Sequence, residues 1–513
     1  MSHHTPGMEP LVRIGMIRAA DLVTFRLREP CTLYDASGEA RTQLAAGTYQ
    51  VSASAAVPAQ IDYFVRLAIR DTKEEAQRAA VEYGEKGWPV TYRHAGLEVD
   101  LGATRVDNRE YWVLAGPFAN EHDAVDFRRQ HEIPAVYLVV EQAVRKPRAT
   151  LHCAGQSFEN TVRLVPPAGK KGVITLANVV VGVEFHWQHL EDQTLFGALE
   201  VTVNNQGKLV AIDELLIEDY LASVNSSEMT VDCPPDLLRA QTVAARATVL
   251  ATMGKHHAAE PFHLCADDHC QRYWGAGYVM EQSRAAAAAT RGEVLMFRGK
   301  VCDARYSKIC GGVAEDYANV WDERRVPYLV PFTDGRTAIP FPIDDEDKAR
   351  AFIDSNPDVF CNTQRYPVPD SLGDSNRLFR WQVCYSREEL QELIARKTGI
   401  EFGELVDLVP GARGASGRLM SLQVVGSRGT FVVGKELEIR RILSESHLYS
   451  ACFYIERERD AQGRVRRFVL HGAGWGHGVG LCQVGATTMA AQGYDYRQIL
   501  AHYYPGTELV KLY

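Results

Sequence analysis

Residues 61–140 carry the pattern that most restricts the fold of this chain. An apolar run of strand length at 63–69 precedes a polar run of helix length at 73–84, and strand-like residues follow at 90–92. The same order returns with a strand at 111–115, a helix at 121–130 and a strand at 135–140. Two β-α-β halves of this size predict one small sheet that is covered by two helices.

The rest of the chain is typical of an α+β protein. Residues 12–51 read as short strands joined by turns, which predicts an N-terminal strand-rich segment over 1–58 and a β-α-β module over 59–145. Prolines and glycines between about 144 and 171 mark a weak boundary, and residues 165–513 then mix strands and helices without a repeat. Residues 340–399 are charged and contain prolines, so we expect an excursion from that body.

Charge and hydropathy argue against two classes of partner. The formal net charge of -9 gives no electrostatic reason to bind nucleic acid. The best apolar runs, 133–140 and 176–183, are of strand length, whereas a membrane span needs roughly 18 to 20 residues. Residues 1–13 contain His and Pro where an export signal has a basic start and an apolar core, so no signal peptide is visible there.

Glu228 lies where two predicted helices meet. The spacing of apolar residues predicts a helix over 213–224 that stops at 225–227, while Asp232 and the prolines at 234–235 predict the start of a second helix that continues to Thr248. A carboxylic acid that is shielded by both helices can keep its proton towards neutral pH and act as a general acid. The ordinary alternative is a solvated or capping glutamate.

A glycine-rich run near the C-terminus provides polar groups beside a flexible backbone. Residues 471–480 contain five glycines, which permit close approach to a ligand and turns with positive φ. His471, His477 and Gln483 can donate hydrogen bonds to a ligand there. The same glycines could instead fold a tight corner in which the histidines satisfy the backbone.

Three ordered blocks of sequence identify a family. The first reads LIEDYL, SEM and LRAQTVAAR at 216–221, 227–229 and 238–246. The central block reads ARYS and CGG at 304–307 and 310–312, followed by Val313 where Thr is more usual. The last reads HGAGWGHGVGLCQVGA at 471–486, with AAQG and ILAHYYPG at 490–493 and 499–506. From about residue 190 to 513 the chain therefore resembles the SpoIID/LytB family of peptidoglycan-acting proteins.

This resemblance implies that residues 165–513 form a SpoIID-type catalytic domain. Active members of the family are lytic transglycosylases, which cleave between N-acetylmuramic acid and N-acetylglucosamine and leave a 1,6-anhydro sugar. The family glutamate corresponds to Glu228, which would first protonate the leaving oxygen and then accept the proton of the C6 hydroxyl. Because the substrate supplies its own nucleophile, the second carboxylate of ordinary glycosidases is not needed. The residues expected to bind substrate are Gln241, Arg246, Tyr306, Gly311, Gly312, His471, His477 and Gln483.

A zinc site is also expected. Residues 263–270 read HLCADDHC and bring together thiols and imidazoles, which Zn(II) binds tetrahedrally. The Cys-x3-His-Cys spacing resembles a segment that binds zinc in some family members, and this implies Cys265, His269 and Cys270 as ligands. For the fourth ligand we place His257 ahead of His256 and His263. Four protein ligands would make this metal structural. The alternatives are a Cys265–Cys270 disulfide or two reduced thiols that bind nothing.

Other functions remain open at this stage. The LytB name records a non-catalytic, peptidoglycan-binding role as enhancer of a cell-wall amidase, and the His-rich segments also permit a zinc-dependent hydrolase. Residues 63–140, with YWVLAGPF at 111–118, resemble a SPOR domain, a module that binds glycan strands stripped of stem peptides, although a generic ferredoxin-like module has the same order. The resemblance implies peptidoglycan as the partner and a location in the cell envelope.

Overall fold

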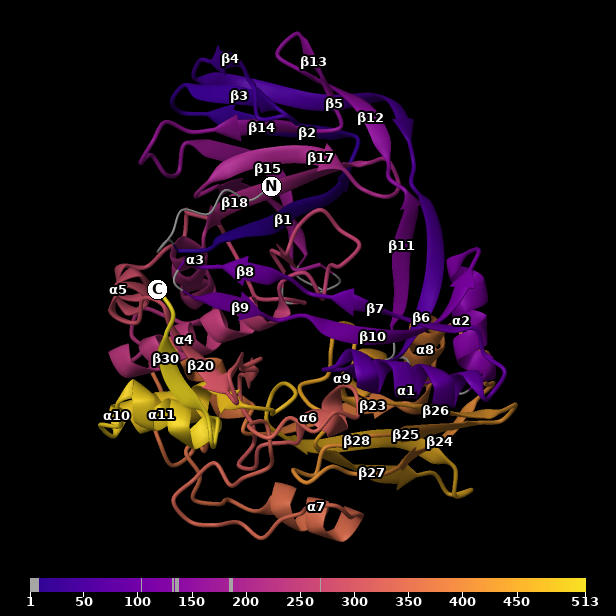
Figure 1. Cartoon of the computed structure of the whole chain (residues 1–513). Helices are drawn as coiled ribbons and strands as arrows, with labels where there is room; N and C mark the ends of the chain where they lie inside the picture. The colour runs from indigo at the N-terminus through magenta and orange to yellow at the C-terminus, as the bar shows by residue number, and fades with distance from the viewer. Residues whose placement is uncertain (1–8, 103, 132, 134–137, 184–187, 268) are drawn as a thin grey trace.

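The computed structural model describes residues 9–102, 104–131, 133, 138–183, 188–267 and 269–513 (Figure 1). The fold is α+β, as predicted. Two mainly antiparallel sheets form the upper part of the molecule in the view of Figure 1. Both contribute buried side chains to one apolar core. The seven-stranded sheet has the order β19 (Leu264–Cys265), β1 (Leu11–Ala20), β18 (Leu209–Leu216), β17 (Ala198–Val203), β14 (Val162–Val165), β3 (Cys31–Asp35) and β4 (Ala40–Leu44). The six-stranded sheet has the order β13 (Gln156–Glu159), β12 (Arg148–Cys153), β5 (Gly47–Val57), β2 (Leu22–Leu27), β15 (Ile174–Val181) and β16 (His189–Thr194).

Strand β1 joins the N-terminal segment to the rest of the fold. It pairs antiparallel with β18, with Leu11 opposite Leu216, and parallel with β19, with Gly15 opposite Cys265. Val12 and Ile14 of β1 are fully buried. The strands of residues 11–57 therefore share both sheets with strands of residues 148–265.

The β-α-β module has the predicted sheet and helices. Its four-stranded sheet has the order β11 (Val139–Arg145), β6 (Gln60–Arg70), β10 (Glu110–Phe118) and β7 (Val90–Ala95). Helices α1 (Lys73–Gly84) and α2 (Glu121–Gln130) have the predicted bounds, and α1 begins at a capping box formed by Thr72 and Glu75. The predicted strand at 135–140 lies partly outside the described residues. A hairpin of β8 (Glu98–Asp100) and β9 (Arg105–Asp107) interrupts the module.

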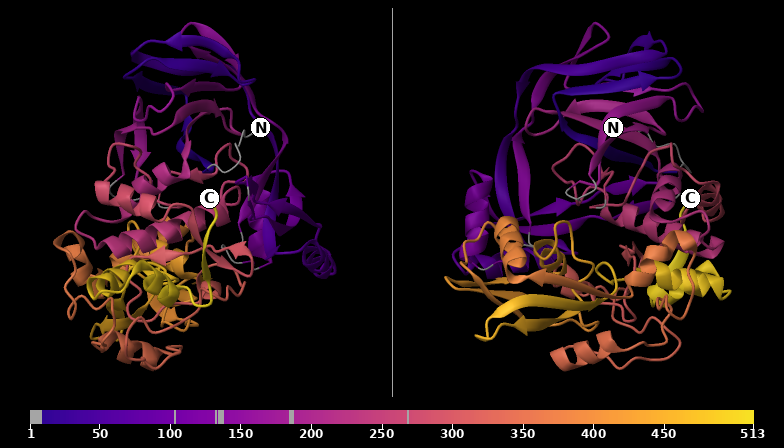
Figure 2. Two further views of the ribbon diagram at one scale, coloured as in Figure 1. Left: turned by 60° about the vertical axis from the view of Figure 1, so that its left-hand side comes forward. Right: turned by 180° about the vertical axis from the view of Figure 1, so that it is seen from behind.

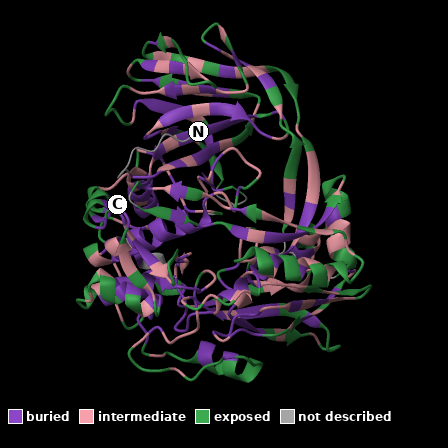
Figure 3. Cartoon of the chain, viewed as in Figure 1, coloured by how far each residue is buried: buried purple, intermediate pink, exposed green. Residues whose placement is uncertain are grey.

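Figures 1 and 2 show the module beside the main body, joined to the upper sheets by the long ribbons of β5–β6 and β11–β12. The outer faces of α1 and α2 are exposed in Figure 3, while most of the central strand β10 is buried. Glu110 of β10 fixes the module to the body, because its carboxylate accepts hydrogen bonds from Lys255 at 3.0 Å and Arg324 at 3.3 Å. Such a buried, doubly paired carboxylate resists separation of the two parts.

The bounds predicted for the helix over 213–224 are wrong. Residues 209–216 form strand β18, and helix α3 spans Ile217–Glu228. Asp213 explains the difference: it is fully buried in the strand, and its carboxylate accepts hydrogen bonds from the Tyr273 hydroxyl at 2.6 Å and from two backbone N–H groups. Burial raises the pKa of Asp213 to about 6. The second predicted helix is confirmed as α4 (Pro235–Thr252), but its N-cap is Pro234 and not Asp232, because the helix begins directly at the second proline.

The C-terminal half adds small sheets and short helices (yellow and orange in Figure 1). One three-stranded sheet has the order β23 (Arg380–Ser386), β28 (Val465–Ala473) and β27 (Phe453–Arg459), so residues 340–399 supply one of its strands. The other strands are β20 (Glu293–Phe297), β21 (Lys300–Val301), β22 (Tyr306–Ser307), β24 (Leu405–Pro410), β25 (Leu422–Gly426), β26 (Thr430–Val433), β29 (Leu481–Cys482) and β30 (Glu508–Lys511). The helices are α5 (Glu281–Ala289), α6 (Tyr317–Val320), α7 (Glu346–Asp354), η1 (Asp370–Arg377), α8 (Arg387–Thr398), α9 (Glu436–Ile442), α10 (Gln483–Ala491) and α11 (Tyr496–Tyr503). Among the described residues, no helix is long and apolar enough to cross a bilayer.

Candidate functional site

Glu228 is the last residue of α3 and is half-buried. Its Oε2 accepts a hydrogen bond of 3.2 Å from Nε2 of Gln483, the first residue of α10. Gln483 itself is buried. The structure thus brings the first and last sequence blocks into contact at the two residues that the sequence singled out.

The central block lies beside this contact. Strand β22 pairs in parallel with β29, with Tyr306 opposite Leu481 and Ser307 opposite Cys482. The backbone N–H of Val484 then donates to the carbonyl of Lys308 at 3.1 Å. These bonds fix the start of α10, and therefore Gln483, against the central block.

Lys308 is a charged neighbour of Glu228 that sequence reasoning missed. Burial lowers the pKa of Lys308, and the negative charge of Glu228 opposes that shift. The sequence did contain a signal for this neighbour, because Lys308 is followed directly by the apolar residues Ile309 and Cys310. A lysine in such an apolar segment is expected to have a charged partner, since lysine is rarely buried alone.

The backbone around Glu228 is held by hydrogen bonds between α3 and α4. The Asn225 side-chain amide donates to the Leu238 carbonyl at 2.9 Å and to the Thr242 hydroxyl at 2.7 Å. The N–H of Met229 donates to the Asn225 carbonyl and ends α3 directly after Glu228. A rigid support of this kind keeps a reacting carboxyl in one place.

Gln241 and Arg246 lie in the core. Both have no exposed surface, and the Arg246 guanidinium donates two hydrogen bonds to the Glu218 carboxylate, at 2.9 and 2.6 Å, and one to the Glu293 carbonyl. Their placement does not support the predicted contact with substrate, because neither side chain reaches the surface. Arg246 instead connects α4 to the start of α3.

The glycines of the central and last blocks allow two backbone segments to approach closely. Gly311 has φ +86°, and Ile309 forms an antiparallel bridge with Trp475. A Cβ on Gly474 would lie 2.6 Å from the Ile309 carbonyl oxygen, so a larger residue would separate the segments. Gly312, with φ +118°, continues the same turn. Trp475 is 38% exposed beside it.

The two histidines of the last block have different surroundings. His477 accepts a hydrogen bond on Nδ1 from the Val479 N–H at 3.0 Å, and its ring lies 4.8 Å from that of Trp321. Burial, together with neighbouring arginines, holds the pKa of His477 well below its usual range, so its imidazole is neutral. His471 on β28 instead stacks on Tyr454 and pairs with Glu456 at 3.1 Å. These contacts favour a structural role for His477, in which it satisfies the backbone of the glycine-rich turn. They place His471 in the C-terminal sheet.

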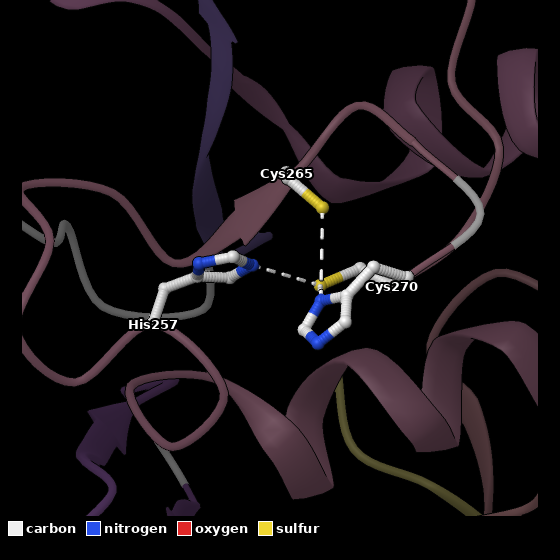
Figure 4. A group of neighbouring side chains, drawn as sticks. His257, Cys265 and Cys270 are labelled. Carbon is white, nitrogen blue, oxygen red and sulfur yellow. Dashed lines mark hydrogen bonds between the residues drawn. The ribbon is translucent and has the colours of Figure 1, made fainter. Parts of the chain in front are cut away.

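The predicted metal ligands converge after α4. One ligand atom from each of His257, Cys265, His269 and Cys270 lies within 4.8 Å of the others. Figure 4 shows the side chains of His257, Cys265 and Cys270 pointing toward one another, from the loop after α4 and from both ends of the turn that follows β19. His257 is buried, as is Cys265.

The separations between these atoms fit a tetrahedral zinc ion. The Cys270 sulfur lies 3.3 Å from His257 Nε2 and 3.7 Å from His269 Nδ1, while the Cys265 sulfur lies 3.9 Å from His269 Nδ1. Zinc bonds of about 2.0 to 2.3 Å in a tetrahedron separate ligand atoms by about 3.3 to 3.8 Å. A hydrogen bond from Cys270, aided by both imidazoles, holds the pKa of the Cys265 thiol far below its usual range. The donor set therefore suits Zn(II).

Comparison with known proteins identifies related chains. Residues 205–297 match the family described as stage II sporulation protein (SpoIID), and residues 315–480 match a domain of unknown function, DUF8618. The chain is 28% identical over 302 residues to an uncharacterized protein of Brachyspira hyodysenteriae. This match covers 59% of this chain and 68% of that protein. It is 24% identical to stage II sporulation protein D of Bacillus amyloliquefaciens, over 58% of this chain and 75% of the relative. It is 25% identical to the amidase enhancer of Bacillus subtilis, over 56% of this chain and 40% of the relative.

Proposed function

Because the chain belongs to the SpoIID/LytB family, we propose that it is a peptidoglycan lytic transglycosylase in which Glu228 is both acid and base. The single observation that carries the proposal is the hydrogen bond from Gln483 to Glu228, which joins two blocks that are 255 residues apart.

The contacts of Glu228 suit both halves of the reaction. The carboxylic acid first gives its proton to the oxygen that joins N-acetylmuramic acid to N-acetylglucosamine, and the glycosidic C1–O bond breaks. The resulting carboxylate then accepts the proton of the muramic acid C6 hydroxyl, whose oxygen bonds to C1 and closes the 1,6-anhydro ring. Gln483 engages Oε2 and leaves Oε1 for proton transfer, while the cation of Lys308 stabilises the carboxylate formed between the steps.

We also propose a structural zinc ion at His257, Cys265, His269 and Cys270. Four protein ligands close the coordination shell, so this ion would supply stability rather than a reactive water. Its role would be to fix the loop after α4 to β19, which itself pairs with β1.

The proposed substrate is the glycan strand of peptidoglycan in the cell envelope, stripped of stem peptides if the module over 59–145 acts as a SPOR domain. Its helices α1 and α2 pack on one face of the sheet, and the other face carries a buried apolar cluster with Trp112 and Leu114. A module of this kind would hold the enzyme on its polymer and raise the local substrate concentration.

A second candidate function is enhancement of a cell-wall amidase without cleavage, and the relative named amidase enhancer favours it. The two are separated by mass spectrometry of purified glycan strands, with and without stem peptides, after incubation with the full chain. We expect new 1,6-anhydro ends. Intact strands, together with faster peptide release when an amidase is added, would establish the enhancer function instead.

Gln483→Ala is expected to lower glycan cleavage about tenfold. It removes a hydrogen bond to a charged carboxylate, worth about 1.5 kcal/mol when the bond is needed in the transition state. The rate of anhydro-end formation per folded molecule measures the effect, and Gln462→Ala, at an exposed turn, is the matched control. An unchanged rate with a lower melting temperature would make Gln483 a packing residue.

A further inference from the structure

A second cluster of metal-ligating side chains lies in the core of the C-terminal half. One ligand atom from each of Cys310, Asp334, Cys361 and Cys482 lies within 4.8 Å of the others. The Cys310 sulfur is 3.6 Å from the Cys361 sulfur and 3.2 Å from Asp334 Oδ2. These residues are at most 2% exposed. The spacing agrees with the roughly 3.3 to 3.8 Å between neighbouring ligands around tetrahedral zinc.

The backbone around the cluster is arranged to stabilise thiolates. The Cys482 sulfur accepts hydrogen bonds from the N–H groups of Cys310 at 3.2 Å and Gly485 at 3.4 Å, at the first turn of α10. The Cys310 sulfur accepts one from the Gly312 N–H at 3.4 Å. N–H donors to sulfur are a usual surrounding of metal-bound cysteines.

Asp334 is held in the orientation of a ligand. Its Oδ1 accepts a hydrogen bond from the Tyr503 hydroxyl at 2.8 Å and lies 3.2 Å from His502 Nε2, which leaves Oδ2 directed at the sulfur atoms. Gly485 makes room for this carboxylate, because a Cβ there would lie 2.4 Å from Oδ2. Outer partners that orient a ligating carboxylate are typical of metal sites.

Buried cations lie beside the cluster and offset its negative charge. Arg380 donates to the Gly311 carbonyl at 3.0 Å, and Arg418 donates to the Cys310 carbonyl at 3.0 Å. Three thiolates and a carboxylate around a divalent ion carry a net charge of about −2, which is costly in a core without such neighbours.

We propose that Cys310, Asp334, Cys361 and Cys482 bind a second Zn(II) ion, with three sulfur ligands and one oxygen ligand. The site would join the central block, the segment over 340–399 and the first turn of α10. Because Cys482 directly precedes Gln483, the ion would also fix the amide that contacts Glu228. The proposal stands independently of the reaction that Glu228 performs.

The test is the zinc content of the full chain purified under reducing conditions with zinc in the growth medium, measured by elemental analysis. We expect two zinc ions per chain, and one in the double variant Cys265→Ser/Cys270→Ser, which removes the first site but leaves the second intact. Cys361→Ser should also hold one, and Cys384→Ser, at an exposed thiol outside both clusters, should keep two.

Cobalt provides a second measurement that does not depend on the folding of Cys361→Ser. The Cys265→Ser/Cys270→Ser variant loaded with Co(II) should show sulfur-to-cobalt charge-transfer absorption and the d–d bands of tetrahedral cobalt. Two outcomes would overturn the proposal: no zinc and no such absorption in that folded double variant, or a Cys310–Cys361 disulfide found by mass spectrometry in the protein kept reduced. Neither outcome would affect anhydro-end formation as a test of Glu228.

Discussion

Glu228→Gln is expected to reduce glycan cleavage about 100-fold or more while glycan binding persists. The substitution keeps the shape of the side chain but removes the proton that the leaving oxygen needs and the carboxylate that accepts the C6 proton. Among the described residues, the Gln483 amide donates a hydrogen bond to Glu228 and the Lys308 cation acts on its charge, and neither group is a carboxylate that could replace it. Anhydro ends per folded molecule, counted by mass spectrometry, measure the loss.

The matched control is Glu281→Gln at the exposed first residue of α5, which should cleave at the normal rate. Sedimentation of each variant with insoluble peptidoglycan measures binding separately. If folded Glu228→Gln released anhydro fragments at the rate of the natural chain, the assignment of Glu228 would be wrong.

Cys270→Ser is expected to lower zinc content by one ion per chain and to lower the melting temperature together with it. Binding of a structural zinc ion contributes roughly 10 kcal/mol or more in small domains, and this energy is also folding energy. Cys270 lies 3.3 Å from His257 and 3.7 Å from His269, so the substitution weakens the ligand set at its centre. Elemental analysis and thermal unfolding in the presence of a reductant measure both effects.

Cleavage per folded molecule should be unchanged by Cys270→Ser if this zinc ion is structural. Cys384→Ser is the control for loss of a thiol as such. A Cys265–Cys270 disulfide in protein kept reduced would contradict the zinc site. Loss of cleavage on removal of zinc, with Glu228→Gln still active, would instead indicate a zinc-dependent hydrolase.

Local signals predicted local structure well. The bounds of α1 and α2 follow from residues at their own ends, such as the capping box of Thr72 and Glu75. Residues 213–216, the end of β18, were assigned to the helix because the apolar residues that follow continue a helical period, and the contact of Asp213 with Tyr273 that fixes the strand joins residues 60 positions apart.

For the site as well, contacts between residues close in sequence could be predicted, and contacts between distant residues could not. The four residues around His257 fall within a short stretch, and the sequence alone placed them together. Glu228 and Gln483 were each predicted, but their hydrogen bond depends on the packing of α10 against the central block. The cluster of Cys310, Cys361 and Cys482 escaped prediction because its members are scattered along the chain. The ion pair of Arg246 with Glu218, which lies 28 residues before it, could not be read from the sequence either.

The pairing of β1 has a consequence for how this protein is made. Leu11 meets its partner Leu216 only after about 200 more residues have been synthesised, which takes roughly 10 to 40 s at about 5 to 20 residues per second. Until then β1, with the apolar residues Val12, Ile14 and Met16, lacks the hydrogen-bonded neighbours β18 and β19 along its two edges. Because an unpaired apolar strand can pair with another chain, we expect β1 to be a site of aggregation while the chain is still being synthesised.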